Sequence, residues 1–208
     1  MTQAAPDAVE THYRRAEAAG ETVLRIDARR SLISIVARRG GRLARLGHDH
    51  VIASRTLEGF VAPEQGRADL RFRLDQLTID EPELRAGAGL DTVVSDAARE
   101  GTRRNMLDKV LDAERFPDVL IHATRVAGAD TLAVAITLHG VTRSVDIPVE
   151  MESRAGPAAD AGLTVSGATS LKQSDFGITP FSVLGGALAV QDQLELRFKI
   201  VAAPRPGE

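Results

Sequence analysis

Residues 193–201 read QLELRFKIV, and this short stretch decides the class of fold. Successive side chains of an extended chain point to opposite faces, so every second residue here shares one face. One face carries mainly charged residues and the other only apolar ones, namely Leu194, Leu196, Phe198 and Ile200. Residues 68–75 (ADLRFRLD) and 144–151 (SVDIPVEM) repeat the pattern, which predicts strands with one buried face.

Further segments of this kind predict an all-β fold. We expect strands at residues 22–27, 31–38, 55–62, 118–126, 131–139 and 162–171, mostly separated by short runs of Gly, Pro, Asp or Asn. A parallel sheet would need many helical crossovers, which this sequence lacks. The repeated polar and apolar faces therefore favour an antiparallel sheet, closed into a barrel or folded into a sandwich.

One amphipathic helix interrupts the strands, at residues 95–111. Ser95 or Asp96 can cap its first turn, and Pro117 prevents its continuation. Its apolar stripe, at three- and four-residue spacings, consists of Met106, Leu107, Val110 and Leu111. Residues 131–139 are apolar on both faces, which predicts a covering element, and this helix is the candidate. We expect it to pack on or over the barrel as a lid.

The composition fits one globular domain that does not bind nucleic acid. The 208 residues carry a net charge of -3, and the basic residues alternate with carboxylates instead of forming a basic stripe. Cysteine is absent, which excludes disulfides and thiolate metal sites. No segment approaches the roughly 18 apolar residues of a membrane-spanning helix. The N-terminus lacks the apolar run of a secretory signal, so the expected location is the cytoplasm.

The predicted boundaries divide the chain into three parts. Residues 1–21 are predicted to be a polar extension with a short helix over residues 8–19, residues 22–203 the barrel domain, and residues 204–208 a frayed end. A barrel leaves few free strand edges, and a homodimer through the helix or the N-terminal extension stays open.

Three motifs, in this order along the chain, resemble the YceI-like family of polyisoprenoid-binding proteins. They are the helix leading into residues 114–117 (ERFP), the turn at residues 138–142 (LHGVT) and residues 174–177 (SDFG). The resemblance covers roughly residues 25–203 and implies an eight-stranded, antiparallel, lipocalin-like barrel around an elongated apolar cavity. It also implies a bound isoprenoid or fatty-acyl lipid and no catalysis. The sequence departs from the family in lacking a secretory signal and in a Gly- and Arg-rich insertion before residues 47–52 (GHDHVI).

The composition supports an apolar cavity independently. Aromatic residues make up 3% of the chain, with no Trp, so the inward faces consist mainly of Leu, Ile, Val and Ala and leave a narrow lumen. Such a lumen suits an alkyl or prenyl chain better than a sugar or nucleotide, which needs several fixed hydrogen bonds. The alternative is that these side chains fill the interior themselves. The candidate cavity or mouth residues are His48, His50, Leu70, Phe72, Phe116, Leu138, Phe176, Phe181, Leu184, Leu196 and Phe198.

The residues Gly47-His48-Asp49-His50 admit three interpretations. If this stretch is extended, His48 and His50 share a face and could reach one zinc, copper or haem iron, with a third ligand from His122 or His139. They could instead be structural, or bind a lipid headgroup at the mouth of the barrel. The third interpretation is a hydrolase that uses them with Asp49 as acid and base, and a hydroxyl from Ser54, Ser174 or Ser182. No nucleophile elbow, metalloprotease helix or phosphate-binding loop accompanies them.

Two glycine pairs are expected to frame one opening. Gly185-Gly186 lies within residues 180–190 (PFSVLGGALAV) and predicts either a hairpin tip or a portal that guides a hydrophobic ligand past Phe181, Val183 and Leu184. Gly40-Gly41 precedes the histidines, and His139-Gly140 is expected to form a hairpin turn. The sequence thus predicts a lipid carrier, store or sensor. The alternative is a His-dependent metal- or haem-binding protein or a hydrolase.

Overall fold

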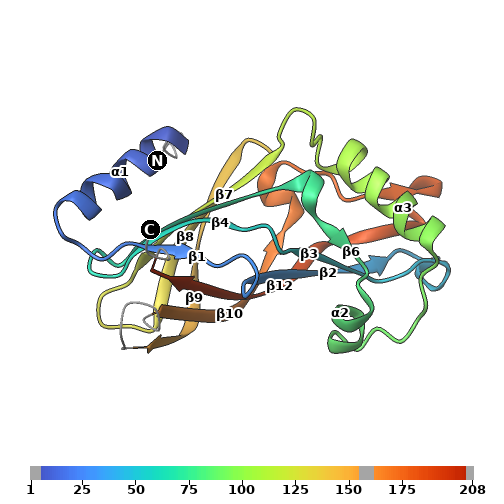
Figure 1. The fold of residues 1–208 in the computed structure, drawn as a ribbon. Helices are drawn as coiled ribbons and strands as arrows, with labels where there is room; N and C mark the ends of the chain where they lie inside the picture. The colour runs from blue at the N-terminus through green and yellow to red at the C-terminus, as the bar shows by residue number, and fades with distance from the viewer. Residues whose placement is uncertain (1–5, 155–161, 205–208) are drawn as a thin grey trace.

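The computed structural model describes residues 6–154 and 162–204, most of which form one antiparallel sheet that closes into a barrel (Figure 1). Its strands are β1 (Leu24–Ile26), β2 (Leu32–Gly40), β3 (His50–Ser54), β4 (Glu58–Ala62), β5 (Arg67–Arg73), β6 (Thr78–Ile79), β7 (Asp118–Arg125), β8 (Thr131–Leu138), β9 (Val141–Arg154), β10 (Gly162–Lys172), β11 (Ser182–Val183) and β12 (Leu188–Ala203). The predicted all-β class is confirmed. Residues 1–5 of the predicted extension and 205–208 of the predicted frayed end lie outside the described residues.

Closure of the barrel depends on β12, the longest of these strands. It pairs with β10 on one side, and on the other side with β2 and, at its last residues, with β1. Three of the barrel's strands are each interrupted and consist of two segments, namely β1 with β2, β3 with β4, and β5 with β6. In one half of the barrel β4 pairs with β1 and β5, and in the other half β3 pairs with β2 and β6. Together with β7, β8, β9, β10 and β12 they complete the predicted eight-stranded antiparallel barrel, which is confirmed.

The strand predicted at residues 55–62 is present as β4, which begins at Glu58 instead of residue 55, and β3 before it was not predicted. β3 ends at Ser54 and β4 begins at Glu58, and between them Leu57 turns inward with only 1% of its surface exposed. Residues 51–54 are all buried, so β3 shows no alternation that a sequence pattern could detect. The other predicted strands are present, with ends shifted by a few residues.

The β8–β9 hairpin shows how local sequence sets the register of a strand pair. Its two-residue loop, His139-Gly140, has a positive φ at both positions, 53° and 74°. This is the geometry of a type I′ turn, whose twist matches that of the paired strands. Leu138 and Val141 pair directly across it. The turn predicted at His139-Gly140 is confirmed.

The predicted helix is present as α3 (Asp96–Arg104), which continues as the π-helical segment η3 (Asn105–Val110). Ser95 Oγ accepts a hydrogen bond from the Ala98 N–H at 3.2 Å and caps α3 as predicted. The expected cover over residues 131–139 is wrong, because α3 packs against β6. The outward side chains of β8 are short, and Ala133 and Ala135 are half-buried.

Several short helical segments escaped prediction. They are α2 (Pro82–Gly87), η1 (Ala44–Leu46), η2 (Leu74–Gln76), η4 (Gln173–Phe176) and η5 (Leu184–Gly186). None spans two full turns, so none produces the repeated apolar stripe by which a helix is recognised in a sequence.

α1 (Pro6–Ala18) packs on the outside of the barrel beside β4 (Figure 1). Tyr13 is 1% exposed, stacks on Phe60 with 5.1 Å between ring centroids, and donates its hydroxyl hydrogen to Asp69 at 2.8 Å. Arg67 and His122 donate to the same carboxylate at 2.8 Å. Burial acts to raise the pKa of Asp69, but hydrogen bonds from Arg67, His122 and Tyr13 outweigh it and lower the pKa. A charged Asp69 therefore anchors α1.

A second buried carboxylate, Asp80, ties α2 to the barrel. Its Oδ1 accepts from the Val51 N–H at 3.0 Å and from Arg85 Nη1 at 2.7 Å, and its Oδ2 accepts from His50 Nδ1 at 2.6 Å. Arg85 lies on α2, is 6% exposed, and also donates to the carbonyl oxygen of Thr92 at 2.6 Å. Burial acts to raise the pKa of Asp80, but the hydrogen bonds from His50, Val51 and Arg85 outweigh it and lower the pKa. Asp80 is therefore a carboxylate and His50 its donor.

Replacing Tyr13 with Phe should lower the free energy of unfolding by about 1–2 kcal/mol, because it removes a buried hydrogen bond to a charged group and keeps the ring. Urea unfolding followed by circular dichroism measures this change. The control is Arg14→Ala on the same helix, which removes an ion pair with Glu10 whose side chains are 72% and 47% exposed. This control should change stability by less than about 0.5 kcal/mol. Equal effects of the two substitutions would contradict the anchoring role of Asp69.

Replacing Asp80 with Asn should lower the free energy of unfolding at neutral pH by about 3–5 kcal/mol, because Arg85 then stays buried without its counter-charge. The folded-state pKa of Asp80 lies below the unfolded value of about 3.9. The carboxylate therefore contributes stability above that pH, and the contribution is lost as the pH falls through the folded-state pKa. The difference in the free energy of unfolding between wild type and the Asp80→Asn variant should therefore become smaller below about pH 4.

Urea titrations at a series of pH values test this expectation. The control is Glu150→Gln, an exposed carboxylate on β9. It should leave stability at neutral pH nearly unchanged. The assigned charge state would be contradicted if the difference in the free energy of unfolding between wild type and the Asp80 variant stayed constant down to pH values well below the unfolded pKa.

Candidate functional site

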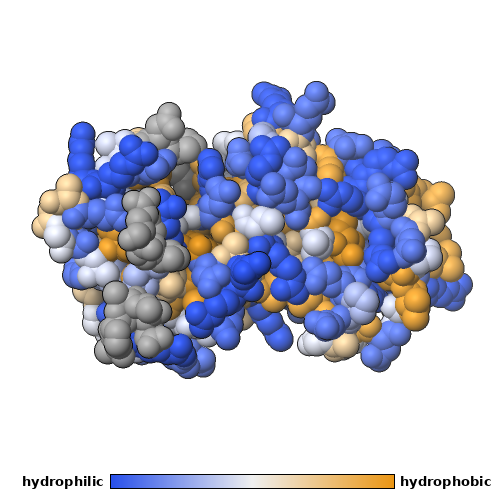
Figure 2. Space-filling model, viewed as in Figure 1, coloured by the Kyte–Doolittle hydropathy of each residue, from blue (hydrophilic) through white to orange (hydrophobic). Residues whose placement is uncertain are grey.

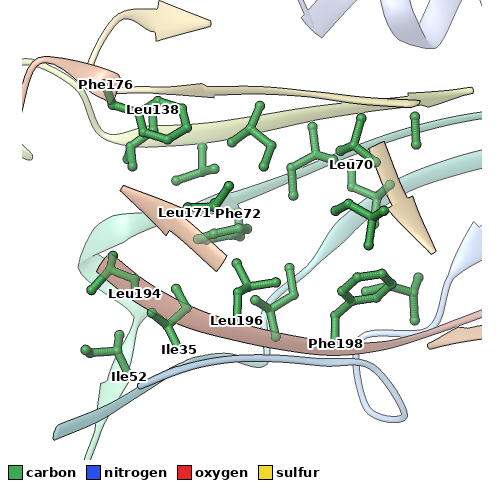
Figure 3. Close-up of a pocket in the computed structure, with 18 of the residues that line it drawn as sticks. Ile35, Ile52, Leu70, Phe72, Leu138, Leu171, Phe176, Leu194, Leu196 and Phe198 are labelled. Atoms are coloured by element: carbon green, nitrogen blue, oxygen red, sulfur yellow. The ribbon is translucent and has the colours of Figure 1, made fainter. Parts of the chain in front are cut away.

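The barrel encloses a cavity of about 560 Å³ (Figure 3). Its wall is built from the inward faces of the strands, and most of the lining side chains are aliphatic. Figure 3 shows Leu70 and Phe72 of β5 facing Leu194, Leu196 and Phe198 of β12 across the interior. An open volume remains between these side chains. The interior is therefore not filled by its own side chains.

Most of the candidate residues line this cavity: His50, Leu70, Phe72, Leu138, Phe176, Phe181, Leu196 and Phe198. His48, Phe116 and Leu184 do not line it. His48 is exposed, Leu184 is 71% exposed, and Phe116 packs on the His139 ring with 4.7 Å between centroids. Contact of any of these residues with a ligand stays a prediction.

The two strands with apolar residues on both faces, β7 and β8, turn one defined face to the cavity. On β7 the lining residues are Val119, Ile121 and Ala123, and on β8 they are Leu132, Val134, Ile136 and Leu138. The register pairs Ile121 with Ile136 and Ala123 with Val134, which puts both sets on the same side of the sheet. His122 lies on the other side, where it donates to Asp69. The sequence alone did not indicate which face of residues 118–126 points inward.

The segment after α3 closes part of the cavity. Met106 and Val110 of η3, with Leu111 after it, belong to the lining, together with Thr102 and Asn105. The Leu111 N–H donates to the Met106 carbonyl oxygen at 2.9 Å, a five-residue spacing that marks the π-helical turn. The role of a lid that the sequence predicted for this helix agrees with these contacts, although the lid sits beside β6 and not over β8.

His50 supplies a polar group in the lining. Its Nδ1 donates to Asp80, so the ring is held in place from behind by a buried charge. Its Nε2 lies 3.4 Å from Thr102 Oγ1, and Thr102 and Asn105 line the same part of the cavity. The partnership of His50 with Asp80 was missed in the sequence, because it joins residues 30 apart that no motif connects. His50 and Thr102 thus form a polar pair within the mainly aliphatic lining.

The other members of the His48-Asp49-His50 cluster do not join this arrangement. Asp49 accepts from the Arg39 backbone N–H at 2.8 Å, and the rings of His48 and His50 lie 6.3 Å apart between centroids. The proposed third ligands are engaged elsewhere, His122 with Asp69 and His139 with Phe116. Among the described residues no group of three His, Cys, Asp or Glu side chains is placed to hold a metal ion. The metal, haem and hydrolase interpretations stay untested predictions.

The hydroxyls considered for a hydrolase lie in three different settings. Ser54 is 1% exposed and its Oγ has no hydrogen-bond partner within the described part of the chain. Ser174 donates its hydroxyl hydrogen to Asp192 at 2.6 Å, and Ser182 is exposed on β11. None of these three hydroxyls forms a hydrogen bond with His48 or His50.

The two Gly-Gly segments lie side by side at one end of the barrel. The Leu43 N–H donates to the Ala187 carbonyl oxygen at 2.7 Å. Gly41 has φ 82°, and a Cβ there would lie 2.4 Å from the same oxygen, so this close approach requires glycine. β11 pairs with β12 through Val183 and Leu188, which confirms that Gly185-Gly186 forms a hairpin tip. Phe181, just before β11, lines the cavity.

None of the helices in the described part of the chain has both the length and the apolar character needed to cross a membrane.

Comparison with known proteins places this architecture in a family. The model of the YceI-like domain matches residues 25–202. A polyisoprenoid-binding domain from Saccharophagus degradans, implicated in plant cell wall breakdown, is 13% identical with a TM-score of 0.60, and the match covers 88% of this chain and 98% of that one. BcnA from Burkholderia cenocepacia is 17% identical with a TM-score of 0.56, over 86% of this chain and 99% of that one.

No curated protein matches the chain. At these identities the two solved structures show a shared fold. Because the family model spans nearly the whole barrel, from residue 25 to residue 202, the chain belongs to the YceI-like family.

Proposed function

We propose that this protein binds the chain of one isoprenoid or fatty-acyl lipid inside its barrel, as a carrier, store or sensor of that lipid. The observation that carries the proposal is the cavity of about 560 Å³ with its mainly aliphatic lining. This volume lies within the range of roughly 300–1,000 Å³ that small-molecule sites occupy. A sugar or nucleotide would require several fixed hydrogen-bonding groups around it, and the lining offers few.

The energetics of such a site are favourable. Burial of apolar surface contributes about 25 cal/mol per Å², so a chain that buries roughly 400 Å² gains on the order of 10 kcal/mol before the cost of association. Water in an apolar cavity lacks hydrogen-bond partners, which favours its replacement by a hydrocarbon. The structural likeness to a polyisoprenoid-binding domain adds support for a chain of this chemical class.

The polar end of the lipid belongs, in this proposal, beside His50. His50, Thr102 and Asn105 bring polar atoms to one part of the lining, where the η3 segment closes the cavity. The buried pair formed by Asp80 and Arg85 fixes the His50 ring, so that one hydrogen-bonding nitrogen is directed away from Asp80. An amphipathic lipid has the matching form, with one polar group at the end of a long apolar chain.

A bulky side chain introduced into the cavity wall should weaken this binding. Ala68 lies on β5 and lines the cavity, so Ala68→Phe places a ring in the space that the chain would occupy. The matched control is Ala135→Phe on β8, whose neighbours Val134 and Ile136 line the cavity whereas Ala135 does not. Native mass spectrometry of delipidated protein with geranylgeraniol or palmitic acid measures the fraction carrying one lipid.

Wild type and Ala135→Phe should form a one-to-one adduct, and Ala68→Phe should bind at least about tenfold more weakly, since loss of roughly 60 Å² of buried apolar contact already has this effect. Circular dichroism confirms that both variants are folded. Absence of any lipid adduct on the wild type, or equal binding by Ala68→Phe, would overturn the proposal.

A further inference from the structure

The largest exposed apolar side chains gather at one end of the barrel. Among the described residues the exposed large hydrophobic side chains are Leu46 (64%), Val93 (92%), Val183 (38%) and Leu184 (71%). They belong to the loop between β2 and β3, the loop between α2 and α3, and the β11 hairpin, all at the end of the barrel opposite α1 (Figure 1). Figure 2 shows apolar surface at this end, on the right of the view.

Two of these loops adjoin residues of the cavity lining. The hairpin that exposes Val183 and Leu184 contributes Phe181 to the lining, and the loop that exposes Leu46 leads into His50, which also belongs to the lining. The loops touch through the hydrogen bond between the Leu43 N–H and the Ala187 carbonyl oxygen. The exposed apolar surface therefore adjoins the apolar interior.

Leu184 is not explained by the stability of this chain. Its φ is 53°, in the left-handed region that residues with a Cβ adopt at an energetic cost, and its side chain is 71% exposed. The residue thus carries backbone strain and buries little apolar surface in return. Strain of this kind is typical of sites that meet a ligand or partner.

Basic side chains flank the apolar ones. Arg42 and Arg45 lie on the same loop as Leu46, and both are exposed. Arg38 and Arg39, just before them, are paired with Glu195 and Asp49. No ion pair between Arg42 or Arg45 and another described residue is present. Exposed leucines beside unpaired arginines suit an anionic lipid leaflet. The leucines can enter its acyl-chain region, and the arginines can bind its negatively charged headgroups.

We propose that these residues form a membrane-docking rim, made of Leu46, Val183, Leu184, Arg42 and Arg45, which places this end of the barrel on the surface of an anionic phospholipid bilayer. The inference rests on the proposed function, in which a lipid chain enters the cavity. At this rim the chain could pass from the bilayer into the cavity without exposing its apolar surface to water. The rim is small, so the contact is weak and reversible, as transfer requires.

Vesicle flotation with the full chain tests the rim. Vesicles of phosphatidylcholine alone are compared with vesicles that contain about 30% phosphatidylglycerol. Wild type should float with the anionic vesicles and bind the neutral ones at least about tenfold more weakly, and about 0.5 M salt should remove most of the difference. The variants are Leu46→Ser with Leu184→Ser, and Arg42→Glu with Arg45→Glu.

Each double variant should lower the bound fraction on anionic vesicles at least about tenfold. The charge-matched control is Arg29→Glu with Arg30→Glu, exposed residues between β1 and β2, which should bind as wild type does. Wild type that stays unbound, or rim variants that float as well as wild type, would overturn the inference. So would light scattering that shows a dimer lost in the Leu46 and Leu184 variant, since the rim would then pair two copies of the chain.

A second measurement separates this inference from the proposed function. Neither Leu46 nor Leu184 lines the cavity, so the Leu46→Ser, Leu184→Ser variant should still form the geranylgeraniol adduct in native mass spectrometry. Its uptake of a prenyl chain from anionic vesicles should be slower than that of wild type by at least about tenfold. Adduct formation without vesicle binding by the wild type would refute the rim alone. Vesicle binding without any adduct would refute the proposed function, and with it the purpose assigned to the rim.

Discussion

Closure of the sheet is the constraint on which the rest of the structure depends. β12 is paired on both sides, with β10 along one edge and with β2 and β1 along the other. Because side chains alternate along a strand, closure directs every second residue of each strand toward the axis. On β12 these are Leu194, Leu196, Phe198 and Ile200, and all of them line the cavity. The hydrogen bonds of the barrel thus decide which side chains face inward, and their aliphatic character leaves the interior hollow.

The buried carboxylates hold the helices to the barrel, and one of them also orients a residue of the cavity lining. Asp69 holds α1 through Tyr13, and Asp80 holds α2 through Arg85. Each carboxylate accepts several hydrogen bonds and has an arginine beside it, which is the condition under which a buried charge is tolerated. The same Asp80 fixes His50, so the element that stabilises this end of the fold also positions the polar group of the lining.

The sequence was sufficient where structure follows from local alternation or from a short turn. The alternating apolar residues of β5, β9 and β12 are predictable because each strand has one face in the interior and one in solvent. His139-Gly140 is predictable because a two-residue loop demands positive φ. β3 was missed because both of its faces are buried, and α2 was missed because six residues are too few for a helical pattern.

The candidate site could be predicted only in part, for a related reason. Inward residues such as Leu70 and Leu196 follow from the alternation of their own strands. The contact of His50 with Asp80, and its proximity to Thr102, depends on how distant segments meet, which no spacing rule encodes. Asp49 is nearer to His50 in the sequence but turns to the Arg39 backbone instead.

The hydrogen bond between Leu43 and Ala187 has a consequence for the motion of the loops at this end. It joins two loops that are far apart in the chain, and Gly41 allows their close approach. Any separation of the loops must break this bond and expose the Leu43 amide to water. The rate of amide hydrogen exchange at Leu43 therefore measures how often the two loops separate.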